Sequence, residues 1–371
     1  MKKSFIVVLA LLQFPLSPAS AAMISAGQKC TKVNQSTIVK SQKLICAKAG
    51  NKLLWKAAPV IAAPTPAPNP STTPIQVASG PTTSVSWKTM SAAEVKSAAK
   101  SAMDKYFETK RTPSQVVTVL AQEGVDSTLK AWVLQGATLV AQTFTYPSST
   151  RAFYDVIAID RDWLQDAYTK AGYSADEVRD RLGGFDSGSP AFGGTVSNTW
   201  NAKTIKNDNL MVRDKIGMAQ TSGHEFFHTI QERLAGRNPG RDGNEIPNWF
   251  WEGPACFVGI NAAATVGALN FDNEGRQAMV DRFKNGNPQT KSLPLKDIKA
   301  NDGIIDPYGI GFAGTEYLVA QVGVEKFLAI YAELGKNKSF DKAFFDSTGI
   351  TLEDFYQHFE SDRAALGFAK N

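Results

Sequence analysis

Two of the three histidines in this chain stand four residues apart, in the stretch Gly223-His224-Glu225-Phe226-Phe227-His228. On a helix, this H-E-x-x-H spacing places both imidazoles one above the other on a single face. Neutral imidazoles placed in this way bind one zinc ion, and the glutamate between them can act as general base on a water held by that ion. The motif therefore predicts a zinc site with His224 and His228 as ligands and Glu225 as the base.

A catalytic zinc site needs a third protein ligand and leaves its fourth position for water. The metzincin pattern requires Gly and then His just downstream, but Gln231 and Leu234 occupy those positions. The remaining histidine, His358, lies in a polar C-terminal stretch and is predicted to be a surface residue. The third ligand is therefore not expected to be a histidine.

Glu252 is the predicted third ligand. Enough chain separates it from His228 for the backbone to turn back and lay a second helix against the first. A carboxylate in apolar surroundings needs a cation, and the neighbours of Glu252 are Trp249, Phe250, Trp251 and Phe257. A site of two histidines and one glutamate still leaves a position open for water.

The segment Trp249-Phe250-Trp251-Glu252-Gly253-Pro254-Ala255 matches the W-x-x-E-G-x-A helix that carries the third ligand in some gluzincin metallopeptidases. Over residues 153–368 the chain resembles this superfamily, and its tail resembles the helical half of peptidase MA-like domains. The resemblance implies an α+β, thermolysin-like catalytic domain. Such a domain has a small mixed sheet, the H-E-x-x-H helix and a C-terminal helical lobe.

The resemblance also implies a mechanism for cleaving a peptide or protein substrate. Zinc would polarise the scissile carbonyl, and Glu225 would pass a proton from water to the leaving amine. In several gluzincins a downstream Tyr or His stabilises the oxyanion. Tyr308 is the predicted residue here and Tyr317 the alternative, although a half-buried packing role suits Tyr308 equally well.

Two departures from the family pattern concern the support of the site. Pro254 falls inside the expected helix, which predicts either a kink or a helix that begins later than Pro247. Cys256 stands where the thermolysin branch has an aspartate that orients a zinc histidine. Another group must then orient the imidazoles, and the unranked candidates are Glu232, Asp242 and Asp306.

Composition excludes some classes of function. The 371 residues are 43% apolar and 20% charged, with a formal charge of +5, which is an ordinary globular balance. The lysines are spread out, with no dense basic run or basic strip interleaved with aromatic residues. The sequence therefore does not predict a nucleic-acid partner.

The N-terminus predicts export. Residues 1–21 combine a basic start, an apolar stretch and Ala19-Ser20-Ala21, which is typical of a signal peptide cleaved before Ala22. No later apolar run is long enough to span a membrane. We therefore expect a secreted, extracellular protein without a membrane span.

Residues 22–57 form a small predicted module in which Cys30 and Cys46 make a disulfide, leaving Cys256 as a buried free thiol. A segment of this size needs such a staple. It resembles a two-cysteine motif of some secreted bacterial proteins. The module could contact a cell wall or surface. The favoured interpretation is a β unit that is held by its disulfide and has no binding role. Residues 58–86, rich in Pro, Ala and Thr, are predicted to be an extended tether.

Residues 87–371 form the predicted metallopeptidase-like domain, beginning with a helical lead-in at 87–146. Helix-start signatures occur at Ser91-x-x-Glu94 and Thr112-Pro113, and residues 127–142 continue the helical pattern. Strands are then predicted at 153–160, 192–200 and 209–213. Helices are predicted at 161–171, from 174, at 217–235, and in the C-terminal lobe at 311–334, 339–347 and 351–366.

Two rival functions are compatible with the same residues. One is a non-catalytic surface- or wall-binding protein built on a peptidase-like scaffold. The other is a zinc amide hydrolase acting on cell-wall peptides. The intact set of ligands and base argues against the first, and the sequence does not specify the cleaved bond.

Overall fold

The computed structural model describes residues 27–30, 36–39, 42–50, 52–57, 87–109, 115–147, 152–187, 191–192, 197–202, 211–240 and 246–370. The chain forms two compact units, Met1–Ser79 and Gly80–Asn371. The predicted signal peptide and tether lie outside the described residues. In the described part of the chain, no helix combines the length and the apolar character that a membrane crossing needs.

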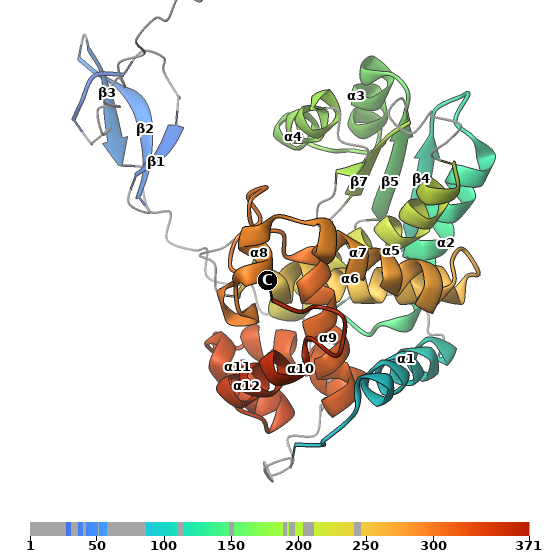
Figure 1. The fold of residues 1–371 in the computed structure, drawn as a ribbon. Coiled ribbons are helices and arrows are strands. Elements are labelled where there is room, and N and C mark those ends of the chain that lie inside the picture. Colours follow the sequence, from blue (N-terminus) through green and yellow to red (C-terminus); the bar gives the residue numbers. More distant parts are fainter. Residues whose placement is uncertain are drawn as a thin grey trace, which may run out of the picture. The chain divides into compact units, whose positions relative to one another are not determined.

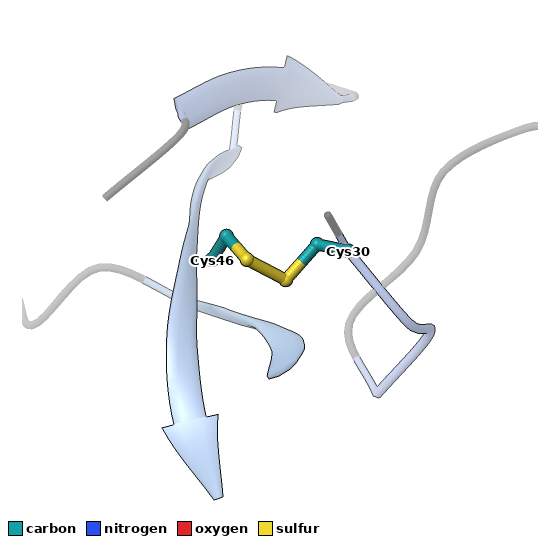
Figure 2. The surroundings of a disulfide bond; sticks show 2 residues. All are labelled: Cys30 and Cys46. Carbon is teal, nitrogen blue, oxygen red and sulfur yellow. A yellow bond between two sulfur atoms is a disulfide. The ribbon is translucent and has the colours of Figure 1, made fainter. Parts of the chain in front are cut away.

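The first unit contains an antiparallel sheet of three strands in the order β1-β2-β3. The strands are β1 (Ser36–Val39), β2 (Gln42–Ala49) and β3 (Lys52–Ala57). Cys46 on β2 is joined to Cys30 by a disulfide with a Cα–Cα distance of 5.8 Å (Figure 2). Cys46 is fully buried and lies opposite Trp55 on β3. The disulfide and Trp55 therefore form the small core of this unit.

The second unit contains a four-stranded sheet in the order β4-β5-β7-β6; Figure 1 labels β4, β5 and β7. Strands β4 (Val117–Ala121), β5 (Phe153–Ala158) and β7 (Ser197–Asn201) are parallel, and β6 (Ala191–Phe192) pairs antiparallel with β7. One face packs on α3 (Arg161–Lys170) and α4 (Ala175–Asp186) through a cluster around Val156 and Tyr168. On the other face, Ile157 and Trp200 contact Val133 of α2 (Ser127–Thr143).

The other regular elements of this unit, among the residues that the structure describes, are helices. They are α1 (Ala92–Glu108), α5 (Met211–Ala235), α6 (Asn248–Thr265), the π-helix η1 (Phe271–Arg276), α7 (Gln277–Asn285), α8 (Pro288–Ser292), the 3-10 helix η2 (Leu295–Asp297), α9 (Tyr308–Val322), α10 (Val324–Leu334), α11 (Phe340–Thr348) and α12 (Leu352–Asp362). Helix α6 packs against both α5 and α9. Nearly all of its residues from Trp249 to Ala263 are buried, as expected of a helix that is apolar all round.

Several predicted elements are confirmed. The capping boxes at Ser91 and Ser174 start α1 and α4, and Thr351 caps α12. Helix α5 ends at Ala235, and Gly236 follows with φ +67°, a conformation that glycine adopts readily. At these four helices, the local signals predicted the observed ends.

The lead-in at 87–146 is not wholly helical. Thr112, Pro113 and Ser114 lie outside the described residues, and no helix follows them, because Val117–Ala121 is strand β4. The run from Val116 to Val119 is β-branched throughout, and β4 gains its hydrogen bonds by pairing with β5. The prediction of a helix start at Thr112-Pro113 is therefore wrong for the residues that the structure describes.

Three further boundaries differ from the predictions. Residues 211–213, predicted as strand, belong to α5. The prediction failed because a short apolar run does not distinguish strand from helix. The strand predicted at 192–200 is instead two antiparallel strands, β6 and β7, with 193–196 outside the described residues. The single helix predicted at 311–334 is divided into α9 and α10 at Gly323, where φ is +80°.

Candidate metal centre

Helix α5 presents both histidines from a fixed position. Ser222, two residues before His224, accepts a hydrogen bond from the Ala137 N–H at 3.1 Å and donates one to the Val133 carbonyl, both on α2. On the same helix, Phe226 packs edge-on against Phe153 of the sheet, with ring centroids 4.8 Å apart. The histidine-bearing turn of α5 is thus tied to α2 and to the sheet.

Helix α6 brings Glu252 to this turn because glycines let the helices approach closely. A Cβ on Gly259 of α6 would lie 2.4 Å from the backbone carbonyl oxygen of Gln220 and 2.9 Å from the backbone nitrogen of His224. A Cβ on Gly253, the residue after Glu252, would lie 2.2 Å from the Gly311 carbonyl carbon of α9. Gly253, the glycine of the W-x-x-E-G segment, therefore allows close packing of α6 on α9, and Gly259 allows close packing of α6 on α5.

The three predicted ligands converge. His224 Nε2 and His228 Nε2 are 3.1 Å apart, and Glu252 Oε2 lies 3.3 Å and 3.4 Å from them respectively. Bonds of about 2.0–2.1 Å at tetrahedral angles put ligand atoms about 3.3–3.4 Å apart. The observed spacings are close to the edges of such a tetrahedron, so a zinc-sized ion fits against all three atoms.

Burial and charge also fit a cation. The exposed fractions of His224, His228 and Glu252 are 7%, 8% and 9%, and the buried Oε2 of Glu252 has no hydrogen-bond partner in the described part of the chain. Burial works to raise the pKa of Glu252, but the two imidazoles outweigh it and lower the pKa. Burial works to lower the pKa of His228, but Glu252 outweighs it and raises the pKa to about 9. The site therefore favours positive charge, which a metal ion supplies by displacing a proton.

Glu225 lies on α5 next to His224 and is only partly buried. Within the described residues its carboxylate has no hydrogen-bond partner, so its oxygens are available to another group. Its charge contributes to raising the pKa of His228. An available carboxylate next to His224 on the same helix suits the role of proton acceptor.

Tyr308 lies beside the site, whereas Tyr317 does not. The Tyr308 and His224 ring centroids are 6.0 Å apart. Asn301 Nδ2 donates to the Tyr308 hydroxyl at 3.0 Å and lies 3.4 Å from Glu252 Oε1. Burial raises the pKa of Tyr308, so its hydroxyl keeps its proton and remains a donor. The Tyr317 hydroxyl instead donates a hydrogen bond to the Asp362 carboxylate.

None of the three candidates for orienting the histidines is seen to do so. Glu232 accepts a hydrogen bond from Asn238, Asp306 pairs with Arg282, and Asp242 lies outside the described residues. The structure places two other residues there.

Those two residues are Gln231 and Cys256. Gln231 Oε1 is 2.6 Å from His228 Nδ1, and Cys256 Sγ is 3.5 Å from His224 Nδ1. The sequence contained a signal for each. Gln231 follows His228 by three residues on the same helix, and Cys256 stands at the position where the thermolysin branch has an aspartate.

Two of the histidine rings stack on tryptophans. Trp251 stacks on His228 with centroids 4.5 Å apart and an interplanar angle of 20°. The third histidine, His358, is exposed as predicted and stacks on Trp87.

No protein-family model, curated protein or solved structure matches this chain. A proposal about function therefore rests on the geometry of the site.

Proposed function

We propose that this chain is a secreted zinc metallopeptidase of the gluzincin type that hydrolyses peptide bonds. The observation that carries the proposal is the triangle of His224 Nε2, His228 Nε2 and Glu252 Oε2, whose edges of 3.1, 3.3 and 3.4 Å suit one tetrahedral zinc ion. The thermolysin-like fold, the zinc identity of the ion and the secreted location belong to the same proposal.

Different residues of the chain have different roles in the proposed hydrolysis. His224, His228 and Glu252 would hold the ion. When bound, zinc supplies Lewis acidity, which polarises the scissile carbonyl and makes water more acidic. Glu225 accepts the proton of the attacking water and returns it to the leaving amine. The Tyr308 hydroxyl, which accepts from Asn301 and so keeps its own proton free, donates to the developing oxyanion.

The proposal is tested by zinc content and peptide hydrolysis in wild type and Glu225→Gln. The substituted protein should keep its zinc, because Glu225 is not a ligand, and should lose at least about a hundredfold in kcat, as general-base catalysis is removed. Glu325→Gln, which changes an exposed acid on α10, is the matched control and should retain activity.

Two outcomes would replace the proposal with its rivals. Bound zinc without hydrolysis of a broad peptide library, in wild type as well as Glu225→Gln, would indicate a binding protein on a peptidase-like scaffold. Cleavage restricted to cell-wall peptide amides, identified by mass spectrometry of the products, would indicate an amide hydrolase instead.

A further inference from the structure

We infer that Gln231 and Tyr331 are positioning residues that fix the orientation of His228 through a chain of hydrogen bonds between helices α5 and α10. This inference rests on the proposed metal centre and deepens it, since it names the groups that prepare one ligand. Gln231 lies on α5 and Tyr331 on α10, and both are fully buried.

The hydrogen bonds of Gln231 determine which nitrogen of His228 carries a proton. Gln231 Nε2 lies 2.9 Å from the Trp251 carbonyl oxygen and 2.8 Å from the Tyr331 hydroxyl. A backbone carbonyl only accepts, so the amide nitrogen must face it and the amide oxygen must face His228. His228 Nδ1 therefore donates to Oε1 at 2.6 Å, and Nε2 presents its lone pair to the site.

Tyr331 holds this amide in place and is itself held. Because its hydroxyl accepts from Gln231, its proton is free to be donated, and it goes to the Phe250 carbonyl at 2.8 Å. The Tyr331 ring stacks on Phe250 with centroids 5.0 Å apart and packs edge-on against Phe227. A fully buried ring held between two others keeps its hydroxyl at one point.

Pro254 explains why the Phe250 carbonyl is available. In an α-helix this carbonyl would accept from the N–H four residues later, which is position 254. Proline has no N–H, so Pro254 leaves the carbonyl without its helical donor, and Tyr331 supplies one. The proline that interrupts the hydrogen bonding of α6 thus links Phe250, Tyr331, Gln231 and His228.

The test separates positioning from stability. Zinc affinity would be measured by competition with a chelator, and melting temperature on the metal-free protein. Gln231→Leu should weaken zinc binding by about 10–100-fold, the usual effect of losing a partner of a metal-bound histidine. Tyr331→Phe should weaken binding about tenfold and lower the melting temperature by about 2–6 °C, because the Phe250 carbonyl loses its donor.

The double variant Tyr331→Phe with Pro254→Ala is decisive. The second substitution restores a backbone N–H that can donate to the Phe250 carbonyl, so the melting temperature should recover while zinc affinity stays reduced. Tyr356→Phe is the matched control: the Tyr356 hydroxyl accepts from Trp249 Nε1, so its loss should lower stability and leave zinc affinity unchanged.

Recovery of zinc affinity in the double variant would show that Tyr331 acts through stability alone and would overturn the inference. So would a Gln231→Leu protein that binds zinc as tightly as wild type. If wild type itself binds no zinc, the proposed function fails first, and that result is distinct from failure of the positioning residues alone.

Discussion

At the scale of single residues, the groups around the centre differ in what holds them. His228 and Glu252 are almost completely buried and fixed by several neighbours, whereas Glu225 is partly exposed and has no hydrogen-bond partner among the described residues. Ligands benefit from rigidity, and a general base must reach a substrate-bound water. The different surroundings of these residues therefore match the roles proposed for them.

Tyr308→Phe tests the proposed oxyanion donor. Loss of one such donor typically lowers kcat by about 10²–10³-fold. KM and zinc affinity should change little, because the hydroxyl acts mainly in the transition state. Tyr317→Phe serves as control, since that hydroxyl bonds to Asp362 away from the centre. Equal kcat values for wild type and Tyr308→Phe would reduce Tyr308 to a packing residue.

Asp155 gives a prediction about pH and stability. It is fully buried on β5 and accepts from Trp200 Nε1 at 2.9 Å and Asn198 Nδ2 at 3.1 Å. Burial raises its pKa to about 7, against the opposing effect of these two hydrogen bonds. The folded state therefore binds a proton that the unfolded state releases near pH ~4. This contribution to stability is fully present below about pH 4 and is lost as pH rises through about 7.

Asp155→Asn removes the ionisation and keeps an oxygen acceptor. Urea unfolding from about pH 5 to about pH 8 should show that the free energy of unfolding falls less steeply with pH in the variant. The difference in slope should approach, at most, about 1 kcal/mol per pH unit. Identical slopes in the two proteins would mean that Asp155 titrates below this range.

At the scale of elements, the centre depends on α6 being held between α5 and α9. The histidines belong to one helix and Glu252 to another, so the ligand spacing is a helix-packing distance. Gly259 sets that distance, since any added Cβ would overlap the backbone of α5 at Gln220 and His224.

Gly259→Ala should therefore push α6 away from α5. We expect a loss of about 1–3 kcal/mol in the free energy of unfolding from overpacking, together with weaker zinc binding. Gly183→Ala on α4 is the matched control, because a Cβ there meets nothing within 4 Å. Alanine should stabilise that helix by about 0.5–1 kcal/mol and leave zinc binding unchanged. Wild-type zinc affinity in Gly259→Ala would mean that helix spacing does not control the centre.

At the scale of the whole molecule, local signals predicted more than distant contacts did. The ends of α1, α4, α5 and α12 follow from caps and glycine within a few residues of each. Strand β4 was missed because the Thr112-Pro113 pattern favoured a helix start, although the following run from Val116 to Val119 is β-branched; its pairing with β5 is a distant contact. The three proposed ligands could be named from the sequence because H-E-x-x-H and W-x-x-E-G are short chemical patterns.

The partners of those ligands were harder to predict. Tyr331 and Gln231 form a hydrogen bond although they are 100 positions apart in the sequence. The role of Tyr331 also depends on the Phe250 carbonyl, which lacks a helical donor because residue 254 is proline. Such a contact exists only after the helices pack. Gln231 stands where the metzincin pattern has glycine, and its three-residue spacing from His228 also suits a hydrogen bond on the same helix face.

The most direct test of the central claim is the position of zinc in crystals of the full chain, located by anomalous scattering at the zinc edge. The account predicts one ion within about 2.0–2.2 Å of His224 Nε2, His228 Nε2 and a Glu252 oxygen. Zinc absent from this point in zinc-containing crystals, or bound with Glu252 turned away from the histidines, would contradict it.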